Sequence, residues 1–310
     1  MNLGTRRTFG ALVGAALLAL CSTCPAVSAQ SDSSDPIRLA VNDWTGAHIT
    51  THVAGEILKR LGYNVEFVSA GYLPQFTALK DGEITASMEI WSSSVGEHWT
   101  EAEESGKVVS LGPLGLEPVE GWMYPKHMEE VCPGLPSWEA LKAPGCVEKL
   151  ATAESFPNGR ILDYPADWGS ATNVVLDEFK LPYVSQPGGS EGALVAEFRS
   201  SLAKKSPLVV MFWSPHWVTA EHEVGWVQFP DGANGPVFPV NKVFKVAWAG
   251  AKDKWPQAMA FVENFRLNNS DYATMIKAVD VDGQKLEDVT QAWVDENEAD
   301  WKQWWEATTN

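Results

Sequence analysis

Basic residues are scarce in this sequence. Its 310 residues include 23 lysines and arginines against 40 aspartates and glutamates, a formal net charge of -17. A surface with such an excess of carboxylates repels nucleic acid phosphates and anionic lipid headgroups. The charge therefore argues against nucleic acid or an anionic membrane as a partner. The length suits one large domain or two small ones with a sizeable core.

The N-terminal segment has an apolar run, residues 9–20, that is too short to span a membrane. Arg6-Arg7 precede this run, and Val27-Ser28-Ala29 after it fits a small-residue cleavage site. We therefore predict a signal peptide over residues 1–29 and export to the periplasm. Thr5-Arg6-Arg7-Thr8-Phe9 also resembles a twin-arginine signal, so that route and general secretion both stay open.

Cysteine is nearly absent, because only Cys132 and Cys146 remain once the signal peptide is removed. An exported chain with two cysteines is expected to form one disulfide, which adds roughly 3 kcal/mol for a loop of this length. A metal site is not expected. The two cysteines lack neighbouring histidines, and His48 and His52 lack the acidic motif that completes a zinc site. We expect no cofactor either.

Hydrophobic periodicity predicts alternating strands and helices. Alternation predicts strands at residues 37–41, 65–68 and 84–90, and apolar spacing predicts helices at 49–61 and 74–80. This order implies an α/β sheet with parallel strands. Ligands of such sheets collect at the carboxyl ends of the strands.

A second lobe begins near Val119. Its predicted strands cover residues 160–164 and 208–212. A further strand is predicted at 243–248, and mostly helical chain follows, at 255–266, 270–279 and 286–306. The stretch rich in glycine and proline at 232–239 is a candidate crossover between lobes.

Tryptophan is unusually abundant, with 15 residues. Trp44, Trp91, Trp168 and Trp213 each stand at the end of a predicted strand, two in each lobe. Such residues fill ordinary cores in many proteins. Four that converge on one cleft would form an aromatic box. This is the usual site for a quaternary ammonium group, which has no N–H to donate.

The segment Asp167-Trp168-Gly169-Ser170 precedes a short predicted helix. Backbone N–H groups at a helix start favour an anion. Gly169 and Ser170 are therefore candidate donors to a ligand carboxylate. Together with the box they describe a site for a zwitterionic betaine.

Several motifs of the mature chain occur in the same order in a known family. They are Asp43-Trp44-Thr45, Leu61-Gly62-Tyr63-Asn64-Val65, Gly82-Glu83-Ile84 with Trp91, Asp167-Trp168-Gly169-Ser170, and Trp213-Ser214-Pro215-His216-Trp217. The chain resembles the glycine betaine/choline-type substrate-binding proteins of ABC importers. The resemblance implies an α/β, two-lobed periplasmic-binding-protein fold of type II with a hinged cleft. It implies a discontinuous first lobe, so we place lobe 1 at 30–118 and 231–310, and lobe 2 at 119–230.

The resemblance also implies roles for individual residues. It makes Trp91, Trp168 and Trp213 cage walls and Trp44 a further wall, with Gly169 and Ser170 as carboxylate donors. Either Trp122 or Tyr124 matches another aromatic position.

One departure concerns the first cage position. Choline-binding relatives carry an aspartate two residues after the first cage tryptophan, where this chain has Gly46. Asp43, His48 or Glu89 are candidates to replace it at the ligand.

The function expected from these features is a non-enzymatic, monomeric binding protein that delivers a methylated zwitterion to an ABC permease and ATPase. Glycine betaine is the first candidate ligand. Choline, trimethylamine N-oxide, dimethylsulfoniopropionate, proline betaine and carnitine share its chemistry. A ligand sensor with the same fold is an alternative. A secreted glycan hydrolase is another, since Asp43, Glu89, Asp163 and Asp167 offer paired carboxylates.

Overall fold

The computed structural model describes residues 32–233, 235–238 and 241–308. The predicted signal peptide lies outside these residues. Among the residues described, no helix has the length and apolar character needed to cross a membrane.

The first sheet has the strand order β2-β1-β3-β12-β4. β1 (Ile37–Val41) pairs in parallel with β2 (Val65–Ser69) and β3 (Ala86–Trp91). β12 (Val243–Trp248) lies antiparallel between β3 and β4 (Val108–Pro113). The parallel pairing expected for the first three strands is thus confirmed for β1, β2 and β3. The other two strands of the sheet, β12 and β4, pair antiparallel. β12 enters from the far end of the chain and inserts beside β3.

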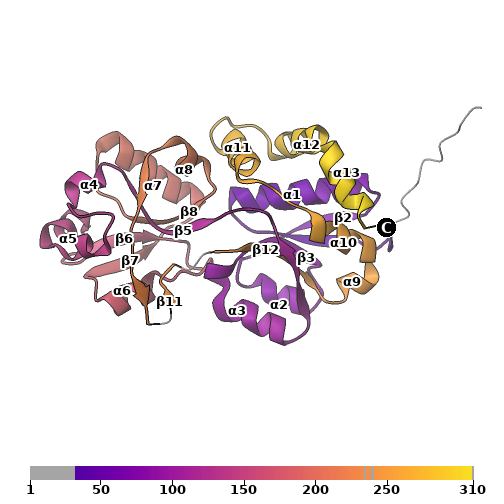
Figure 1. The fold of residues 1–310 in the computed structure, drawn as a ribbon, viewed down its shortest axis with the longest axis horizontal. Coiled ribbons are helices and arrows are strands. Elements are labelled where there is room, and N and C mark those ends of the chain that lie inside the picture. The colour runs from indigo at the N-terminus through magenta and orange to yellow at the C-terminus, as the bar shows by residue number, and fades with distance from the viewer. Residues whose placement is uncertain (1–31, 234, 239–240, 309–310) are drawn as a thin grey trace, which may run out of the picture. The chain divides into compact units, whose positions relative to one another are not determined.

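Helices from both ends of the chain cover the first sheet. α1 (Thr45–Arg60) buries the apolar face predicted from its spacing, including Ile49, Val53 and Ile57, and packs on the C-terminal helices α11 and α12 (Figure 1). The other helices of this lobe are α2 (Gln75–Lys80), α3 (Ser92–Glu104), α9 (Ala251–Lys254), α10 (Pro256–Asn264), α11 (Asn269–Asp280), α12 (Leu286–Glu296) and α13 (Glu298–Glu306).

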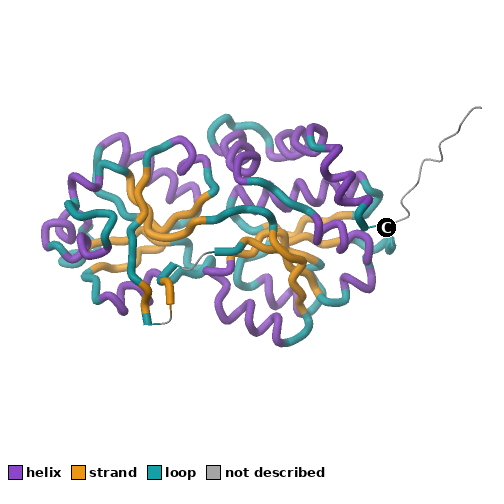
Figure 2. Tube along the Cα trace, in the orientation of Figure 1, coloured by secondary structure: helices purple, strands orange, loops and turns teal. Residues whose placement is uncertain are grey.

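The second sheet has the order β7-β6-β8-β5-β9. β6 (Gly159–Asp163) is parallel to β7 (Tyr183–Pro187) and β8 (Val210–Ser214), and β5 (Val119–Pro125) is antiparallel to β8 and β9 (Val224–Trp226). Figure 2 shows each group of strands flanked by its own helices. Those of the second sheet are α4 (Met128–Val131), the 3-10 helix Trp138–Lys142, α5 (Pro144–Leu150), α6 (Thr172–Phe179), α7 (Glu191–Lys204) and α8 (Trp217–Glu221).

The predicted disulfide between Cys132 and Cys146 is confirmed. It joins the end of α4 to α5 and so ties together a region built of short helices. Farther along the chain, the hairpin of β10 (Asp231–Gly232) and β11 (Gly235–Pro236) lies on the path from β9 back to β12.

Candidate functional site

The four strand-end tryptophans meet around one small cavity. The first lobe contributes Trp44, Tyr72, Trp91 and Ser94 to its lining, and the second lobe contributes Glu120, Tyr164, Trp168 and Trp213. All four tryptophans are buried. Each lies where a strand ends: Trp91 is the last residue of β3, and Trp44 and Trp168 follow β1 and β6. We call these four residues the cage tryptophans.

The aromatic rings around the cavity are inclined to one another. The ring centroids of Trp44 and Trp168 are 5.3 Å apart at an interplanar angle of 65°, and those of Trp168 and Trp213 are 5.8 Å apart at 70°. Tyr72 meets Trp44 edge-on at 5.0 Å, and Tyr164 lies 5.7 Å from Trp213. Rings inclined in this way form a concave wall, which suits a rounded, methylated group.

Asp43 and Glu89 bind the cage tryptophans and do not line the cavity. The indole Nε1 atoms of Trp44 and Trp91 both donate to Oε1 of Glu89, at 2.7 and 2.9 Å. The Nε1 atom of Trp168 donates to Oδ1 of Asp43 at 2.7 Å, which links the two lobes. The structure thus places two of the predicted ligand contacts next to the rings, outside the cavity lining.

The surroundings of Glu89 also explain the glycine at position 46. Tyr272 Oη donates to Glu89 Oε1 at 2.8 Å, and Thr50 Oγ1 bonds Oε2 at 3.0 Å. A Cβ atom added to Gly46 would lie 1.7 Å from Tyr272 Oη. Tyr272 therefore occupies the space that a side chain at position 46 would need. Burial raises the pKa of the Glu89 carboxyl, while its hydrogen bonds act in the opposite direction.

Glu120 is a site residue that the sequence reasoning missed. It lies on β5, is buried, and lines the cavity. Its carboxyl group accepts hydrogen bonds from Ser93, from Ser94 at 3.2 Å, and from Asn241. Burial raises the pKa of Glu120, against the effect of these hydrogen bonds. Among the eight lining residues, Glu120 alone carries an acidic or basic side chain.

Tyr72 and Tyr164 were also missed, although a signal was present. Tyr164 directly follows β6, and Tyr72 follows β2 after a short loop, so both meet the strand-end criterion that identified the tryptophans. For Glu120 the sequence holds no such signal, because it stands near the start of a strand inside an apolar segment.

Gly169 and Ser170 lie beside the cavity but do not line it. Ser170 Oγ donates to Asp163 Oδ1 at 2.7 Å and accepts from the Thr172 N–H at 3.0 Å. Gly169 has a φ of 80°, and a Cβ there would lie 2.5 Å from the carbonyl oxygen of Ser94 in the other lobe. Both residues thus shape the turn that carries Trp168.

The aromatic pair Trp122 and Tyr124 does not line the cavity either. Trp122 is fully buried in the second lobe, where it donates to Thr172 Oγ1 at 3.2 Å and packs against Phe229. Tyr124 Oη bonds Glu129 at 3.2 Å.

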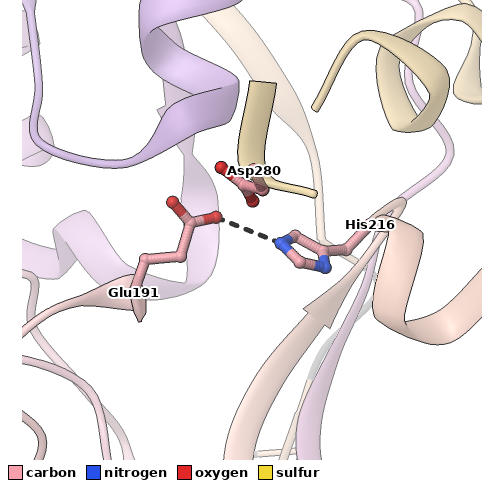
Figure 3. Close-up of side chains that lie close together, drawn as sticks. All are labelled: Glu191, His216 and Asp280. Carbon is pink, nitrogen blue, oxygen red and sulfur yellow. Dashed lines mark hydrogen bonds and ion pairs between the residues drawn. The ribbon is translucent and has the colours of Figure 1, made fainter. Parts of the chain in front are cut away.

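A second cluster of polar groups lies between the lobes: Glu191, His216 and Asp280 (Figure 3). Their potential ligand atoms lie within 4.8 Å of one another, and the residue types suit a metal ion. The histidine ring argues against one. His216 Nδ1 accepts from the backbone N–H of Val218 at 3.1 Å, so Nε2 carries the proton and donates to Glu191 Oε1 at 3.1 Å. A protonated Nε2 has no lone pair for a metal.

The carboxylate oxygens of this cluster also have donors. Glu191 Oε2 accepts from the Thr45 N–H at 2.7 Å, at the start of α1. Asp280 accepts from Thr45 Oγ1 at 2.7 Å and from Trp217 Nε1 at 3.0 Å. Since Thr45 and Asp280 belong to the first lobe and the others to the second, we call Glu191, His216 and Asp280 the interlobe cluster.

A family model matches residues 35–296 of the chain: OpuAC, described as the substrate binding domain of an ABC-type glycine betaine transport system. The chain belongs to this family. An OpuAC-family chain is a non-enzymatic, extracytoplasmic substrate-binding protein of an ABC importer for quaternary amines. The enzyme alternative raised from the sequence is therefore wrong.

Curated proteins similar to this OpuAC-family chain include two transport binding proteins. The trimethylamine N-oxide-binding protein of Pelagibacter ubique (strain HTCC1062) is 28% identical over 290 residues, which cover 89% of this chain and 92% of that protein. The glycine betaine/carnitine transport binding protein GbuC of Listeria monocytogenes is 23% identical over 108 residues, 35% of each chain.

Solved structures share the fold at lower identity. Lactococcal OpuAC, closed around glycine betaine, has a TM-score of 0.73 at 17% identity, covering 87% of this chain and 99% of that one. An ABC-transporter choline binding protein with choline has a TM-score of 0.76 at 17% identity, covering 88% and 92%. ProX from Borrelia burgdorferi has a TM-score of 0.76 at 18% identity, covering 89% and 100%. The predicted two-lobed binding-protein fold of type II is confirmed.

Proposed function

We propose that this OpuAC-family protein captures trimethylamine N-oxide, with the four cage tryptophans as walls and Glu120 as the polar partner. One observation carries the proposal: of the residues that line the cavity, Glu120 alone has an acidic or basic side chain, and its carboxyl group is buried. This carboxyl group can distinguish between ligands by the polar group that each one carries beside its methylated nitrogen.

Trimethylamine N-oxide fits this lining. Its methyl groups suit ring faces, and its oxygen is a hydrogen-bond acceptor. When protonated, the Glu120 carboxyl group can donate to such an oxygen, and burial favours the protonated form by raising the pKa of Glu120. The cavity is small and lined mainly by aromatic rings, which suits a compact methylated solute. The similarity to a trimethylamine N-oxide-binding protein along 89% of the chain supports the same ligand.

Glycine betaine, the first candidate from the sequence, fits less well. Its carboxylate needs donors, and the proposed donors Gly169 and Ser170 lie outside the cavity lining. An ionised Glu120 would repel a carboxylate. Choline is the second candidate, because an ionised Glu120 attracts its cation and accepts from its hydroxyl group.

Calorimetric titration with trimethylamine N-oxide, choline and glycine betaine, at a series of pH values over which the protein stays folded, tests this choice. If a protonated Glu120 donates to the N-oxide, affinity for trimethylamine N-oxide falls as pH rises through the pKa of Glu120. Choline affinity rises over the same range. Tighter binding of choline or glycine betaine at every pH overturns the proposal.

A matched pair of variants tests the residue itself. Glu120→Gln keeps a hydrogen-bond donor, so its affinity for trimethylamine N-oxide should stay within a few-fold of the wild-type value and should not depend on pH. Glu120→Ala should lose binding of trimethylamine N-oxide. Glu139→Gln removes an exposed carboxylate outside the cavity lining and serves as the charge control.

We also propose the organisation that goes with this function. The signal peptide directs a monomer to the periplasm, where the lobes at 30–118 with 231–310 and at 119–230 close on the ligand. The closed protein then docks on an ABC permease with its ATPase. Light scattering of the mature protein that showed a dimer would contradict the monomeric state.

A further inference from the structure

Three of the four cage tryptophans donate their indole N–H to a carboxylate. Trp44 and Trp91 share Glu89, and Trp168 uses Asp43. Trp213 differs, because its Nε1 atom is buried without a hydrogen-bond partner among the described residues. Charge-assisted bonds of 2.7–2.9 Å to indoles recur here on the walls of a single cavity.

We propose that Glu89 is a positioning residue that fixes Trp44 and Trp91 and, through their N–H groups, strengthens the attraction of both rings for a methylated cation. The inference rests on the proposed cation-binding function of the cavity. A carboxylate that accepts an indole N–H shifts electron density into the ring, since hydrogen-bonded groups polarise each other in a low dielectric. The attraction between a ring face and a cation is electrostatic, so it grows with that density.

We take the Glu89 carboxyl group to be ionised in the folded protein because of the donors around it, which act against the effect of burial on its pKa. Oε1 takes three donors, from Trp44, Trp91 and Tyr272, and Oε2 is bonded by Thr50. An ionised carboxylate has about four acceptor positions, and hydrogen bonds of this kind favour the ionised form. Because Glu89 does not line the cavity, its charge acts on the rings without competing for the ligand.

The environment allows the charge to be removed without moving the rings. In Glu89→Gln the amide oxygen can keep the three donors of Oε1. The new NH₂ group can donate to Thr50 Oγ1, which already bonds the Ala47 carbonyl at 3.2 Å and so has an acceptor for its own proton. The variant is therefore expected to fold with both tryptophans in place.

The test compares each compound that has a positively charged, methylated nitrogen with its carbon analogue, which has no positive charge. The pairs are trimethylamine N-oxide with tert-butanol, and choline with 3,3-dimethylbutan-1-ol. Dissociation constants come from tryptophan fluorescence titrations of the mature wild type, Glu89→Gln and the control Glu139→Gln. We expect Glu89→Gln to weaken the nitrogen compounds about tenfold and the carbon analogues less than about twofold, since only the electrostatic attraction for the positively charged nitrogen changes. A residue with a purely structural role would change both members of a pair alike.

The outcomes separate this inference from the proposed function. Equal losses for both members of a pair, or no loss at all, overturn the polarising role of Glu89 and leave cation binding intact. A wild type that binds neither nitrogen compound overturns both proposals. Glu89→Leu removes the acceptor altogether, and we expect it to weaken the carbon analogues too, which reports the positioning role separately.

Discussion

The two halves of the cage are held in different ways. Trp44 and Trp91 are fixed inside the first lobe, because Glu89 and its other partners Thr50 and Tyr272 all belong to that lobe. In the second lobe, Trp168 depends on Asp43 across the cleft. The first half is therefore held within one lobe, and the second half is held by a bond between the lobes. If the lobes close on the ligand as proposed, mutations in the first half should change intrinsic affinity, and mutations of bonds between the lobes should change the stability of the closed state.

The largest effect on ligand affinity is expected when one of the two cage tryptophans of the second lobe is removed. Trp168→Ala or Trp213→Ala should weaken trimethylamine N-oxide binding by more than about a hundredfold. Each removes a desolvated ring contact of up to about 2 kcal/mol and admits water to the cage. Calorimetry measures the loss, and circular dichroism checks the fold.

Trp226→Ala is the matched control for these two variants. It removes a half-buried tryptophan of the same lobe that does not line the cavity, so it should leave affinity unchanged. Normal binding by both cage variants would remove Trp168 and Trp213 from the site.

A smaller effect is expected from the interlobe cluster. Glu191→Ala removes the bonds to Thr45 N and His216 Nε2 without touching the cavity lining. It should weaken every ligand by about the same factor, of order tenfold, because it acts on closure alone. Small-angle scattering should show a larger ligand-free radius. Glu197→Ala, an exposed acid on the same helix, is the control. A change confined to one ligand would contradict a role in closure.

Sequence patterns predicted the walls of the cage better than its polar groups. Strand periodicity shows where each strand ends, so Trp44, Trp91, Trp168 and Trp213 could be placed together before any coordinates. Such patterns do not show which way a side chain points within a segment. For this reason Glu120 was missed and Ser170, which bonds Asp163, was expected at the ligand.

Contacts between segments far apart in the chain also could not be predicted from the sequence. The insertion of β12 beside β3 joins segments about 150 residues apart, and local periodicity carries no information about such pairing. The same holds for Tyr272, which fills the space above Gly46 from the C-terminal part of the chain. The glycine was visible as a departure from choline-binding relatives, but its cause was not.

The smallest effect on binding is expected for Lys245, a buried lysine of β12 in the first lobe. Its Nζ donates to the carbonyls of Phe265 at 2.6 Å and Glu263 at 3.3 Å, and burial lowers its pKa to about 6. Arg266 bonds the same two carbonyls. Lys245→Met therefore leaves no carbonyl without a donor, and ligand affinity should not change.

The variant should instead change how stability depends on pH. Between about pH 6 and the ordinary lysine pKa of about 10.4, the unfolded chain holds a proton that the folded Lys245 has released. The free energy of unfolding contributed by this group thus rises with pH across that window and is lowest below it. Lys245→Met should flatten this rise in urea titrations, with the same ligand dissociation constant as the wild type. A shifted dissociation constant would show that the first lobe is not preformed as a unit independent of the cage.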